Sequence, residues 1–202
     1  SALENPSWRT STPTERGAAL GRLADALAAR RSALADLTTA EIGSPRSWST
    51  FGQVLTAVGV LRAYSQLAPT YPFESVRASA TGGTVDVRQL PVGVVAAVIP
   101  WNTPLFIAAL KLGPALAAGC TVVLKPAPDA PLNIGVLMEA VEEAGIPPGV
   151  VNVVNGGADT GRCLVSHPGV DKVTFTGSTA VGAQIAATCG SLIRRCSLEL
   201  GG

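Results

Sequence analysis

The sequence predicts an α/β fold: a parallel sheet with helices on both faces, preceded by helices and a β-ribbon. Two observations predict the sheet. From Pro91 onward, short apolar segments alternate with segments of helical periodicity. These apolar segments are continuous runs, as is typical of strands covered on both faces. We therefore expect residues 1–90 to form N-terminal helices and the start of the ribbon, and residues 91–202 to form the α/β domain.

A first helix is expected over residues 12–37. Thr12-Pro13-Thr14-Glu15 fits a capping box with Pro at the first helical position. Five leucines recur at helical spacing and predict one buried face: Leu20, Leu23, Leu27, Leu34 and Leu37. The arginines between them, such as Arg22 and Arg30, are expected on the solvated face. The helix should end near Gly43.

A second helix is expected over residues 49–68, followed by a loop up to Gly83 and a strand over residues 84–88. The apolar stripe of this helix is predicted to consist of Phe51, Leu55, Val58, Leu61 and Leu67. The strand alternates apolar and polar residues, which predicts a paired ribbon with one wet face.

The α/β domain should alternate strands with helices. We expect strands over residues 92–99, 121–124, 150–154, 172–176 and 196–200, and helices over 104–118, 132–144, 160–166 and 180–189. Right-handed crossovers place the carboxyl ends of such strands on one edge of the sheet, where open α/β sheets bind ligands.

Composition excludes several classes of protein. The net charge of +1 gives no reason to expect nucleic acid or an anionic membrane surface. The sequence has no run of about 18 apolar residues, so no membrane span is expected. Charged residues make up only 14%, against roughly 25% in an average soluble domain. We interpret this as a piece of a larger body or a subunit with large interfaces.

The cysteines predict no metal site. Cys120, Cys163, Cys189 and Cys196 show no CxxC spacing, and His167 is the single histidine. We expect free, buried thiols, as in a reducing cytosol, and hence a cytoplasmic protein.

Residues with chemical potential follow the predicted strands. The first strand runs into Ile99-Pro100-Trp101-Asn102, the second into Lys125, the third into a turn with Gly157 and nearby Gly161, and the fourth into Gly177-Ser178. An amide, a cation, glycine turns and a helix N-cap would thus share one edge. Lys125 there could bind ribose hydroxyls or phosphate of a dinucleotide, or could be a solvated lysine at a strand end.

The stretch Val173–Gly182 predicts a strand, a glycine turn and a helix that begins after Ser178. The amino end of a helix favours an anion. Gly177 and Gly182 form G-x-x-x-x-G, which fits either a phosphate-binding turn or a tight turn where only glycine is tolerated. No Gly-Lys-Ser/Thr follows, so this is not a nucleoside triphosphate loop.

Two further residues each allow two interpretations. The amide of Asn102 could stabilise an oxyanion, or the residue could cap the helix that begins near Pro104. Glu199 stands in an otherwise apolar run, where a desolvated carboxylate would have a raised pKa and could act as a general base. Its alternative is a paired charge at a strand end.

Five motifs together resemble the aldehyde dehydrogenase superfamily over nearly the whole chain. They are PWN at 100–102, KLGPALAAG at 111–119, TVVLKPA at 121–127, FTGS at 175–178 and ELGG at 199–202. The segment Trp8–Leu27 is similar to the helix that precedes the family's core. The resemblance implies a variant Rossmann domain over residues 91–202 that binds NAD, with NADP possible. It also implies oxidation of a small-molecule aldehyde through a cysteine thiohemiacetal and a thioester.

The resemblance implies roles for individual residues. Asn102 would hold the oxyanion, Glu199 would activate water, and Lys111 would take part in proton relay. Lys125 would bind the adenosine ribose. Gly157 and Gly161 would lie near the adenine, and Gly177, Ser178 and Val181 near the pyrophosphate and nicotinamide. The same cofactor site would include Ile99, Pro100, Trp101, Asn102, Pro128, Phe175, Thr176, Glu199, Leu200 and Gly201.

Two departures from the family pattern matter. Many NAD-preferring members carry Glu where this chain has Pro128, so NADP remains an option. The family's nucleophilic cysteine lies beyond the ELGG motif, and none of the four cysteines here fits that context. We therefore expect this chain alone not to oxidise aldehydes, and the full-length protein to be a homo-oligomer, a dimer or a tetramer.

Two other functions remain open. One is a non-catalytic nucleotide-binding or scaffold module of the same fold. The other is an acyl-phosphate-forming reductase of the same superfamily. The intact Glu199 favours the hydrolytic branch, because water activation needs that base.

Overall fold

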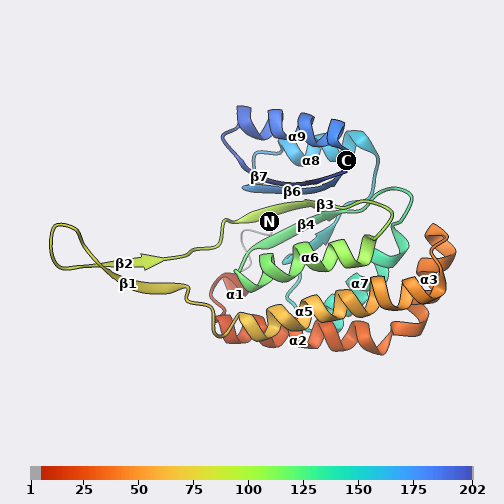
Figure 1. Ribbon diagram of the computed structural model, residues 1–202, viewed down its shortest axis with the longest axis horizontal. Coiled ribbons are helices and arrows are strands. Elements are labelled where there is room, and N and C mark those ends of the chain that lie inside the picture. The colour runs from red at the N-terminus through yellow and green to blue at the C-terminus, as the bar shows by residue number, and fades with distance from the viewer. Residues whose placement is uncertain (1–5, 202) are drawn as a thin grey trace.

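The computed structural model describes residues 6–201 and contains a five-stranded parallel sheet in the order β5-β4-β3-β6-β7 (Figure 1). Its strands are β3 (Val94–Val98), β4 (Thr121–Lys125), β5 (Val151–Val153), β6 (Lys172–Gly177) and β7 (Arg195–Leu200). Counted from the first strand of the sheet, this is the 3-2-1-4-5 order of a Rossmann-type domain. The predicted fold class is confirmed.

Helices cover both faces of this sheet (Figure 1). On one face lie α6 (Pro104–Ala117) and α7 (Leu132–Glu143), and on the other α8 (Ala158–Ser166) and α9 (Thr179–Ser191). Alternate residues of β3 divide between two cores: Val95 and Ala97 pack with α6 and α7, whereas Val94 and Ala96 pack with α8 and α9. This two-sided burial explains the continuous apolar strands of the sequence. From Pro91 onward the predicted element bounds differ from the observed ones by at most two residues.

The N-terminal helices form an outer layer beside α6 and α7 (Figure 1). They are α1 (Pro6–Arg9), α2 (Pro13–Ala29), α3 (Arg31–Ile42), α4 (Arg46–Trp48), the π-helical segment η2 (Ser49–Leu55) and α5 (Thr56–Leu67). The capping box is confirmed, since the Thr12 amide donates to Glu15 Oε2 over 2.7 Å and the Glu15 amide donates to Thr12 Oγ1 over 3.2 Å.

The single helix expected over residues 12–37 is wrong. The chain breaks at Arg30, whose ψ of 8° leaves the helical range and whose amide donates to Leu27 O. The break lets α2 pack on α5 while α3 packs on η2. Helix α3 then ends at Gly43, which adopts the left-handed conformation that favours glycine (φ 69°), as predicted.

The stripe predicted for the second helix is partly wrong. Phe51 is 67% exposed and Leu67 is 45% exposed, whereas Val54 and Ala57 are fully buried. Residues Ser49–Leu55 form a π-helical turn, which is wider than an α-helical one. The wider turn changes which residues face the core. Uniform α-helical spacing therefore predicts the wrong buried residues on either side of this turn.

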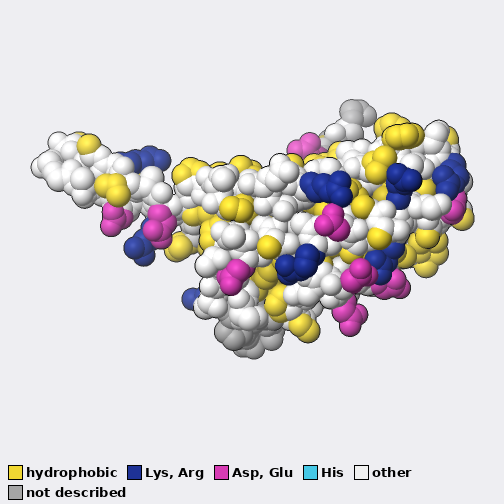
Figure 2. Space-filling view, turned by 90° about the horizontal axis from the view of Figure 1, so that it is seen from below, with side chains coloured by type: hydrophobic (Ala, Val, Ile, Leu, Met, Phe, Trp, Pro, Cys, Tyr) yellow, Lys and Arg dark blue, Asp and Glu magenta, His cyan; other side chains and the backbone are white. Residues whose placement is uncertain are grey.

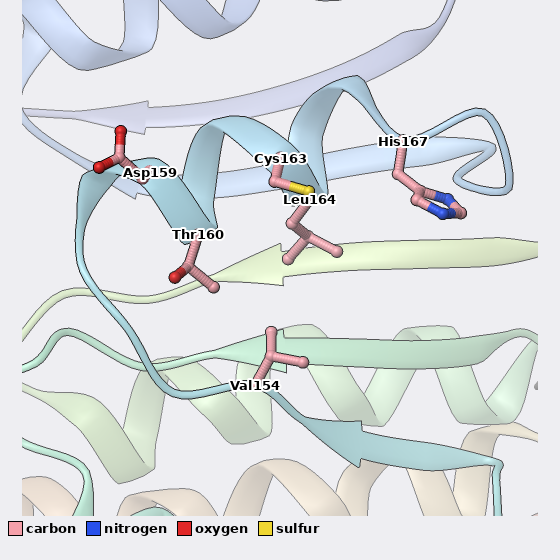
Figure 3. A pocket seen from close by; sticks show the side chains of 6 residues that line it. All are labelled: Val154, Asp159, Thr160, Cys163, Leu164 and His167. Atoms are coloured by element: carbon pink, nitrogen blue, oxygen red, sulfur yellow. The ribbon is translucent and has the colours of Figure 1, made fainter.

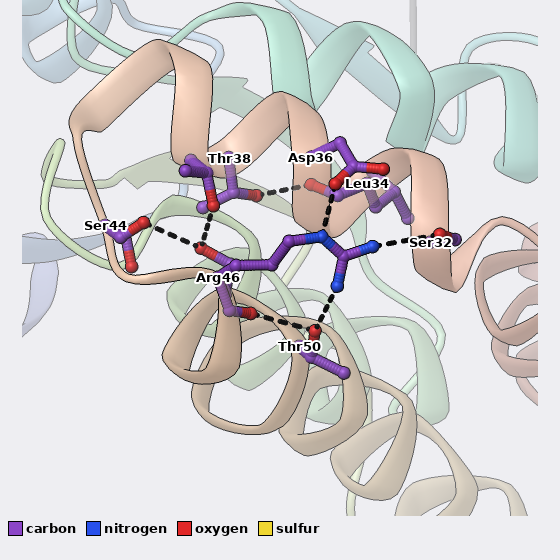
Figure 4. A network of polar contacts seen from close by, with 9 residues as sticks. Ser32, Leu34, Asp36, Thr38, Ser44, Arg46 and Thr50 are labelled. Atoms are coloured by element: carbon purple, nitrogen blue, oxygen red, sulfur yellow. Dashed lines mark hydrogen bonds and ion pairs between the residues drawn. The ribbon is translucent and has the colours of Figure 1, made fainter.

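A polar network fixes the junction between α3 and η2 (Figure 4). The Arg46 guanidinium pairs with Asp36 and donates to Ser32 Oγ over 3.0 Å and to Thr50 Oγ1 over 3.3 Å. Thr38 Oγ1 donates to Leu34 O over 2.7 Å on the same helix. One side chain thus joins two helical segments that the short α4 brings together.

Three arginines close the carboxyl ends of helices on other elements. Arg16 Nε donates to Ala117 O of α6 over 2.9 Å, and Arg22 Nε donates to Ala144 O after α7 over 2.7 Å. Arg194 donates to Val165 O and to His167 O at the end of α8. These bonds satisfy carbonyls that a helix end leaves free and place a cation where the helix dipole favours one. Arg22 is exposed, as predicted, and in addition binds the end of α7.

Strands β1 (Glu74–Ala78) and β2 (Thr84–Arg88) pair antiparallel and project from the body (Figure 1). The predicted ribbon is confirmed, although β1 lies where a loop was expected. Both of its faces are largely exposed, with Val76 67% and Val85 49% exposed. The prediction of one wet face is therefore wrong for this structure.

The outer helical layer carries charges of both signs. Basic and acidic side chains are interspersed on the face seen in Figure 2, as a net charge of +1 suggests. Within residues 6–201, no helix combines the length and the apolar character needed to cross a membrane.

Candidate functional site

A cleft of about 730 Å³ lies at the carboxyl edge of the sheet, bounded by α8 and α9. It sits where the sheet order reverses, since β4 and β6 lie on opposite sides of β3. Twelve of the residues predicted for the cofactor site line it: Ile99, Pro100, Trp101, Lys125, Pro128, Gly157, Gly161, Phe175, Thr176, Gly177, Ser178 and Val181. The parallel-strand argument thus correctly located the cleft.

The amino end of α9 faces this cleft. Ser178 has extended backbone geometry, and its Oγ accepts a hydrogen bond from the Val181 amide over 3.4 Å, as expected for an N-cap. Unsatisfied amides of the first turn and the helix dipole make this end suitable for an anion such as a pyrophosphate.

The two glycines of G-x-x-x-x-G have different reasons to be glycine. A Cβ on Gly177 would lie 2.5 Å from the Phe175 ring. A Cβ on Gly182 would collide with the Leu200 side chain, so β7 can approach α9 only at a glycine. Gly177 lines the cleft, whereas Gly182 is a packing position between a helix and a strand.

Lys125 is a buried cation at the floor of the cleft. Its side chain is 5% exposed, and Nζ donates to Pro126 O over 2.9 Å. Burial lowers the pKa of its ammonium, and it forms no ion pair within the described residues. An ammonium has three donors, so two remain for oxygen acceptors of a ligand. The alternative of a solvated lysine is wrong.

The facing sides of α8 and α9 form the walls of the cleft. Sequence reasoning missed nine lining residues: Val98, Ala127, Ala158, Arg162, Val165, Ser166, Gln184, Ile185 and Thr188. On α9 the lining positions Val181, Gln184, Ile185 and Thr188 recur at three, four and seven residues. Helical periodicity from Ser178 onward would have found them.

The residue types of the cleft fit a dinucleotide. Its walls are mostly apolar, which suits flat rings, while Lys125 and the amino end of α9 suit ribose oxygens and phosphates. A Cβ on Gly157 would meet no atom within 4 Å, so its bare backbone borders open space. None of the lining residues in the described part of the chain is acidic.

Leu200 and Gly201 were predicted to contact the cofactor, but neither lines the cleft. They hold the turn before α9 instead. The Gly201 amide donates to Gly177 O over 3.2 Å, and Thr179 Oγ1 donates to Gly201 O over 2.6 Å. These bonds tie the end of β7 to the end of β6.

Glu199 and Lys111 form a second group, on the opposite face of β6 and β7. Glu199 is adjacent to Thr176 in the register of the two strands and is exposed, so the expected desolvation is wrong for this structure. It also lacks an ion pair in the described part of the chain, contrary to its alternative interpretation.

Lys111 reaches toward this group from α6. It is 7% exposed, and Nζ donates to Thr174 Oγ1 over 2.9 Å. Burial lowers the pKa of Lys111 to about 8; the Glu199 charge opposes this shift and the Lys172 charge adds to it. Such a lysine changes protonation state near neutral pH.

Asn102 lies in the loop between β3 and α6 and is exposed. The N-cap of α6 is Thr103, so the capping interpretation of Asn102 is wrong. The backbone of Asn102 is held from η2, because the buried Gln53 donates from Nε2 to Asn102 O over 2.9 Å. Its side chain does not line the cleft.

The cysteines lie apart from both groups. All four are free thiols; Cys120 and Cys189 are buried as predicted, but Cys163 on α8 and Cys196 on the edge strand β7 are exposed. Within residues 6–201, no three His, Cys, Asp or Glu side chains converge as metal ligands would.

A second hollow of about 460 Å³ lies on the other side of α8 (Figure 3). It is lined by Val154, Asp159, Thr160, Cys163, Leu164 and His167. It shares no lining residue with the cleft, and His167 Nδ1 already accepts the Gly169 amide over 3.0 Å. The cleft is therefore the candidate site.

Comparisons with known proteins agree with this geometry. A model of the aldehyde dehydrogenase family matches residues 1–202. Geranial dehydrogenase of Castellaniella defragrans is 46% identical over 201 residues, which cover 100% of this chain and 42% of that protein. The NADP/NAD-dependent aldehyde dehydrogenase PuuC of Escherichia coli is 40% identical over 202 residues, covering 99% of this chain and 41% of that protein.

A solved structure is similar as well. The NAD⁺ complex of an aldehyde dehydrogenase from Bacillus cereus superposes with a TM-score of 0.95 at 37% identity, covering 100% of this chain and 41% of that one. The chain thus spans about two fifths of the length of these relatives.

Proposed function

The chain belongs to the aldehyde dehydrogenase family, and on that basis we propose that the protein carrying it oxidises an aldehyde to a carboxylic acid with NAD. The observation that carries this proposal is the cleft at the carboxyl edge, with the buried Lys125 and the amino end of α9 opening into it. The dinucleotide, when bound, supplies the hydride acceptor.

The residues of the cleft have distinct tasks in this proposal. Lys125 donates from Nζ to ribose hydroxyls or to a phosphate. The amides around Gly177 and Ser178 bind the pyrophosphate. The apolar faces of α8 and α9 exclude water from the flat rings. These contacts orient the ligand toward the end of β6.

The second group performs the proton chemistry. Glu199 acts as general base and takes a proton from water that attacks the acyl intermediate. Lys111, with a pKa of about 8, exchanges protons with Glu199. The Asn102 amide donates to the oxyanion, a type of contact that contributes about 3–4 kcal/mol to transition-state stabilisation.

The protein is also proposed to accept NADP. The acid-free lining of the cleft supports this, because no carboxylate there repels a 2′-phosphate and both Lys125 and Arg162 are cationic. The relative PuuC is named as using either dinucleotide.

Three coarser features complete the proposal. Residues 1–90 form a helical layer with a ribbon, and residues 91–202 form the cofactor-binding domain.

The whole protein is a homo-oligomer, a dimer or a tetramer, which the projecting ribbon with its exposed Val76 and Val85 supports. It is cytoplasmic, which four free thiols support.

Aldehyde-dependent formation of NADH by the whole protein tests the proposal. Wild type should produce NADH with a panel of aldehydes, and Glu199→Gln should lose at least about 100-fold in kcat, since general-base catalysis contributes 10²–10⁴-fold. Glu139→Gln, an exposed glutamate on α7, is the matched control and should keep its rate.

Two results would contradict the proposal. Wild type without activity toward any aldehyde, yet with tight dinucleotide binding, would favour the non-catalytic nucleotide-binding module. Equal rates for Glu199→Gln and Glu139→Gln would remove Glu199 from the mechanism.

A further inference from the structure

Strands β6 and β7 have one apolar and one polar face. Val173 and Phe175 point into the core with α8 and α9, and Leu198 packs there from β7. Because side chains alternate along a strand, the residues between them share the opposite face. That polar face comprises Lys172, Thr174 and Thr176 of β6 and their register neighbours Arg195, Ser197 and Glu199 of β7.

Lys111 approaches this polar face from α6. Its burial to 7% exposure removes water from most of the side chain, yet no carboxylate pairs with it within residues 6–201. Its Nζ donates to Thr174 Oγ1 over 2.9 Å, a contact between α6 and the middle of β6. The Thr174 hydroxyl is thus the side-chain acceptor that the structure gives this ammonium.

The charges that act on Lys111 come from the same two strands. Glu199 on β7 favours its protonated form and Lys172 on β6 disfavours it. Two other titratable side chains face α6 elsewhere, Tyr64 at Gly113 and Arg16 at Ala117. Glu199 is therefore the carboxylate whose charge acts on Lys111, while the Lys111 Nζ itself is bonded to Thr174.

We propose that Thr174 is a positioning residue, whose hydroxyl holds the Lys111 Nζ over the polar face of β6 and β7 so that Lys111 and Glu199 can exchange a proton. Glu199, protonated by the attacking water, passes this proton through solvent at its exposed side chain to the neutral Lys111 amine. The amine becomes an ammonium, which donates a hydrogen bond to the Thr174 hydroxyl. Glu199 returns to a carboxylate. This inference rests on the proposed function for the role of Glu199.

A threonine suits this task. Its β-branched side chain is stiff at χ1, so the strand fixes where the hydroxyl points. As an acceptor it favours the charged form of the lysine without neutralising it, which leaves the proton free to move.

Competitive acetylation across a pH series tests the contact in the whole protein. Trace acetic anhydride labels only the neutral amine, and peptide mass spectrometry reports Lys111 separately from other lysines. Wild type should show a labelling midpoint near pH 8. Thr174→Val removes the acceptor and should lower the midpoint by roughly one pH unit, because the charged form loses its hydrogen bond. Thr174→Ser should restore it.

A matched control separates the contact from a general effect on the face. Ser197→Ala changes the register neighbour of Thr174 and removes a hydroxyl that is not bonded to Lys111, so it should leave the midpoint unchanged. A midpoint that is the same in Thr174→Val and wild type would overturn the proposal, as would an equal shift in Ser197→Ala. Thr174→Ala gives a second reading should the valine variant not fold.

The pH profile of aldehyde oxidation then tests the use of the contact. The part of the pH–rate profile that reports the titration of Lys111 should shift in Thr174→Val by the same amount as the labelling midpoint. In Thr174→Ser it should return to the wild-type position. The affinity for NAD should stay constant in both variants. A profile that stays fixed while the midpoint moves would overturn the positioning role. Absence of any aldehyde oxidation in wild type would instead overturn the proposed function, and the midpoints would still decide the contact itself.

Discussion

At the residue scale, we expect Pro128 to influence which dinucleotide the cleft accepts. It lines the cleft after β4, three residues beyond Lys125, and no acidic side chain lies among the described lining residues. Pro128→Glu adds a carboxylate near the proposed ribose site. We expect the KM for NADP to rise at least about tenfold, since like charges repel in a partly desolvated site, while the KM for NAD stays constant or falls.

Steady-state kinetics with both dinucleotides checks this expectation. Pro128→Gln is the control, because it has a similar shape without the charge and should affect both cofactors alike. A Pro128→Glu variant that uses NADP as well as wild type does would show that the adenosine ribose lies elsewhere.

Lys111 makes stability depend on pH in a defined direction. Its folded pKa of about 8 lies below the value of about 10.4 of an unfolded lysine. Between these two values the unfolded chain binds more protons, so this group makes stability rise with pH, and its burial is fully unfavourable below pH 8. Lys111→Met should therefore be more stable than wild type at pH 7 by about 1–3 kcal/mol, and this difference should vanish near pH 10.5.

Urea unfolding of both proteins at the two pH values measures that difference. Taking the difference between variant and wild type cancels the other groups that titrate over the same range. A stability difference that is equal at both pH values would show that burial of the Lys111 charge is not the cause.

At the scale of elements, long-range contacts complete the helix ends. Arg16 on α2 is 7% exposed and donates to Ala117 O of α6. Arg16→Met leaves that carbonyl without its partner and removes a cation from the carboxyl end of α6. We expect the free energy of unfolding to fall by about 1–3 kcal/mol, as measured by chemical denaturation of the whole protein.

Arg31→Met is the control for this variant, because Arg31 is an exposed arginine at the start of α3. Its stability should stay within about 0.5 kcal/mol of wild type. If both variants lost the same stability, general loss of charge rather than helix capping would be responsible.

Local sequence signals predicted the elements that depend on neighbouring residues. The capping box at Thr12, the end of α3 at Gly43 and the N-cap Ser178 are all set within four residues of chain. The break at Arg30 and the π-turn at Ser49–Leu55 were missed because packing between helices decides them. Likewise the amide of Leu132 at the start of α7 donates over 2.6 Å to Glu41, which lies 91 residues earlier in the chain.

The candidate site could be predicted to a similar extent. Parallel strands fix where their carboxyl ends lie, so most motif residues at those ends lie along the cleft, although Asn102, Leu200 and Gly201 do not. The face of the sheet on which Glu199 and Lys111 lie could not be predicted, because the sequence does not show which face of β6 and β7 is covered. The walls on α8 and α9 depend on how two helices face each other across a gap.

At the scale of the whole molecule, the sheet separates the two functions that we propose. The cleft lies on the side of α8 and α9, and Lys111 and Thr174, which belong to the proposed proton-transfer group, meet on the side of α6. The two meet at the end of β6, where Thr176 lines the cleft and neighbours Glu199 in the strand register. Chemistry that uses both groups belongs at that edge.

We expect these 202 residues to bind a dinucleotide but not to reduce it catalytically. None of their four cysteines lines the cleft, so we expect no nucleophile there. The isolated chain, mixed with aldehyde and NAD, should give no steady increase in absorbance at the wavelength of NADH, whereas the whole protein should. Steady turnover by the isolated chain would require a different nucleophile.

A crystal structure of the whole protein with NAD tests the central claim most directly. We predict the dinucleotide in the cleft, with its rings between α8 and α9, its pyrophosphate at the amino end of α9 and a ribose oxygen within hydrogen-bonding distance of Lys125 Nζ. An NAD molecule bound elsewhere, or a cleft without the dinucleotide at saturating NAD, would contradict the account.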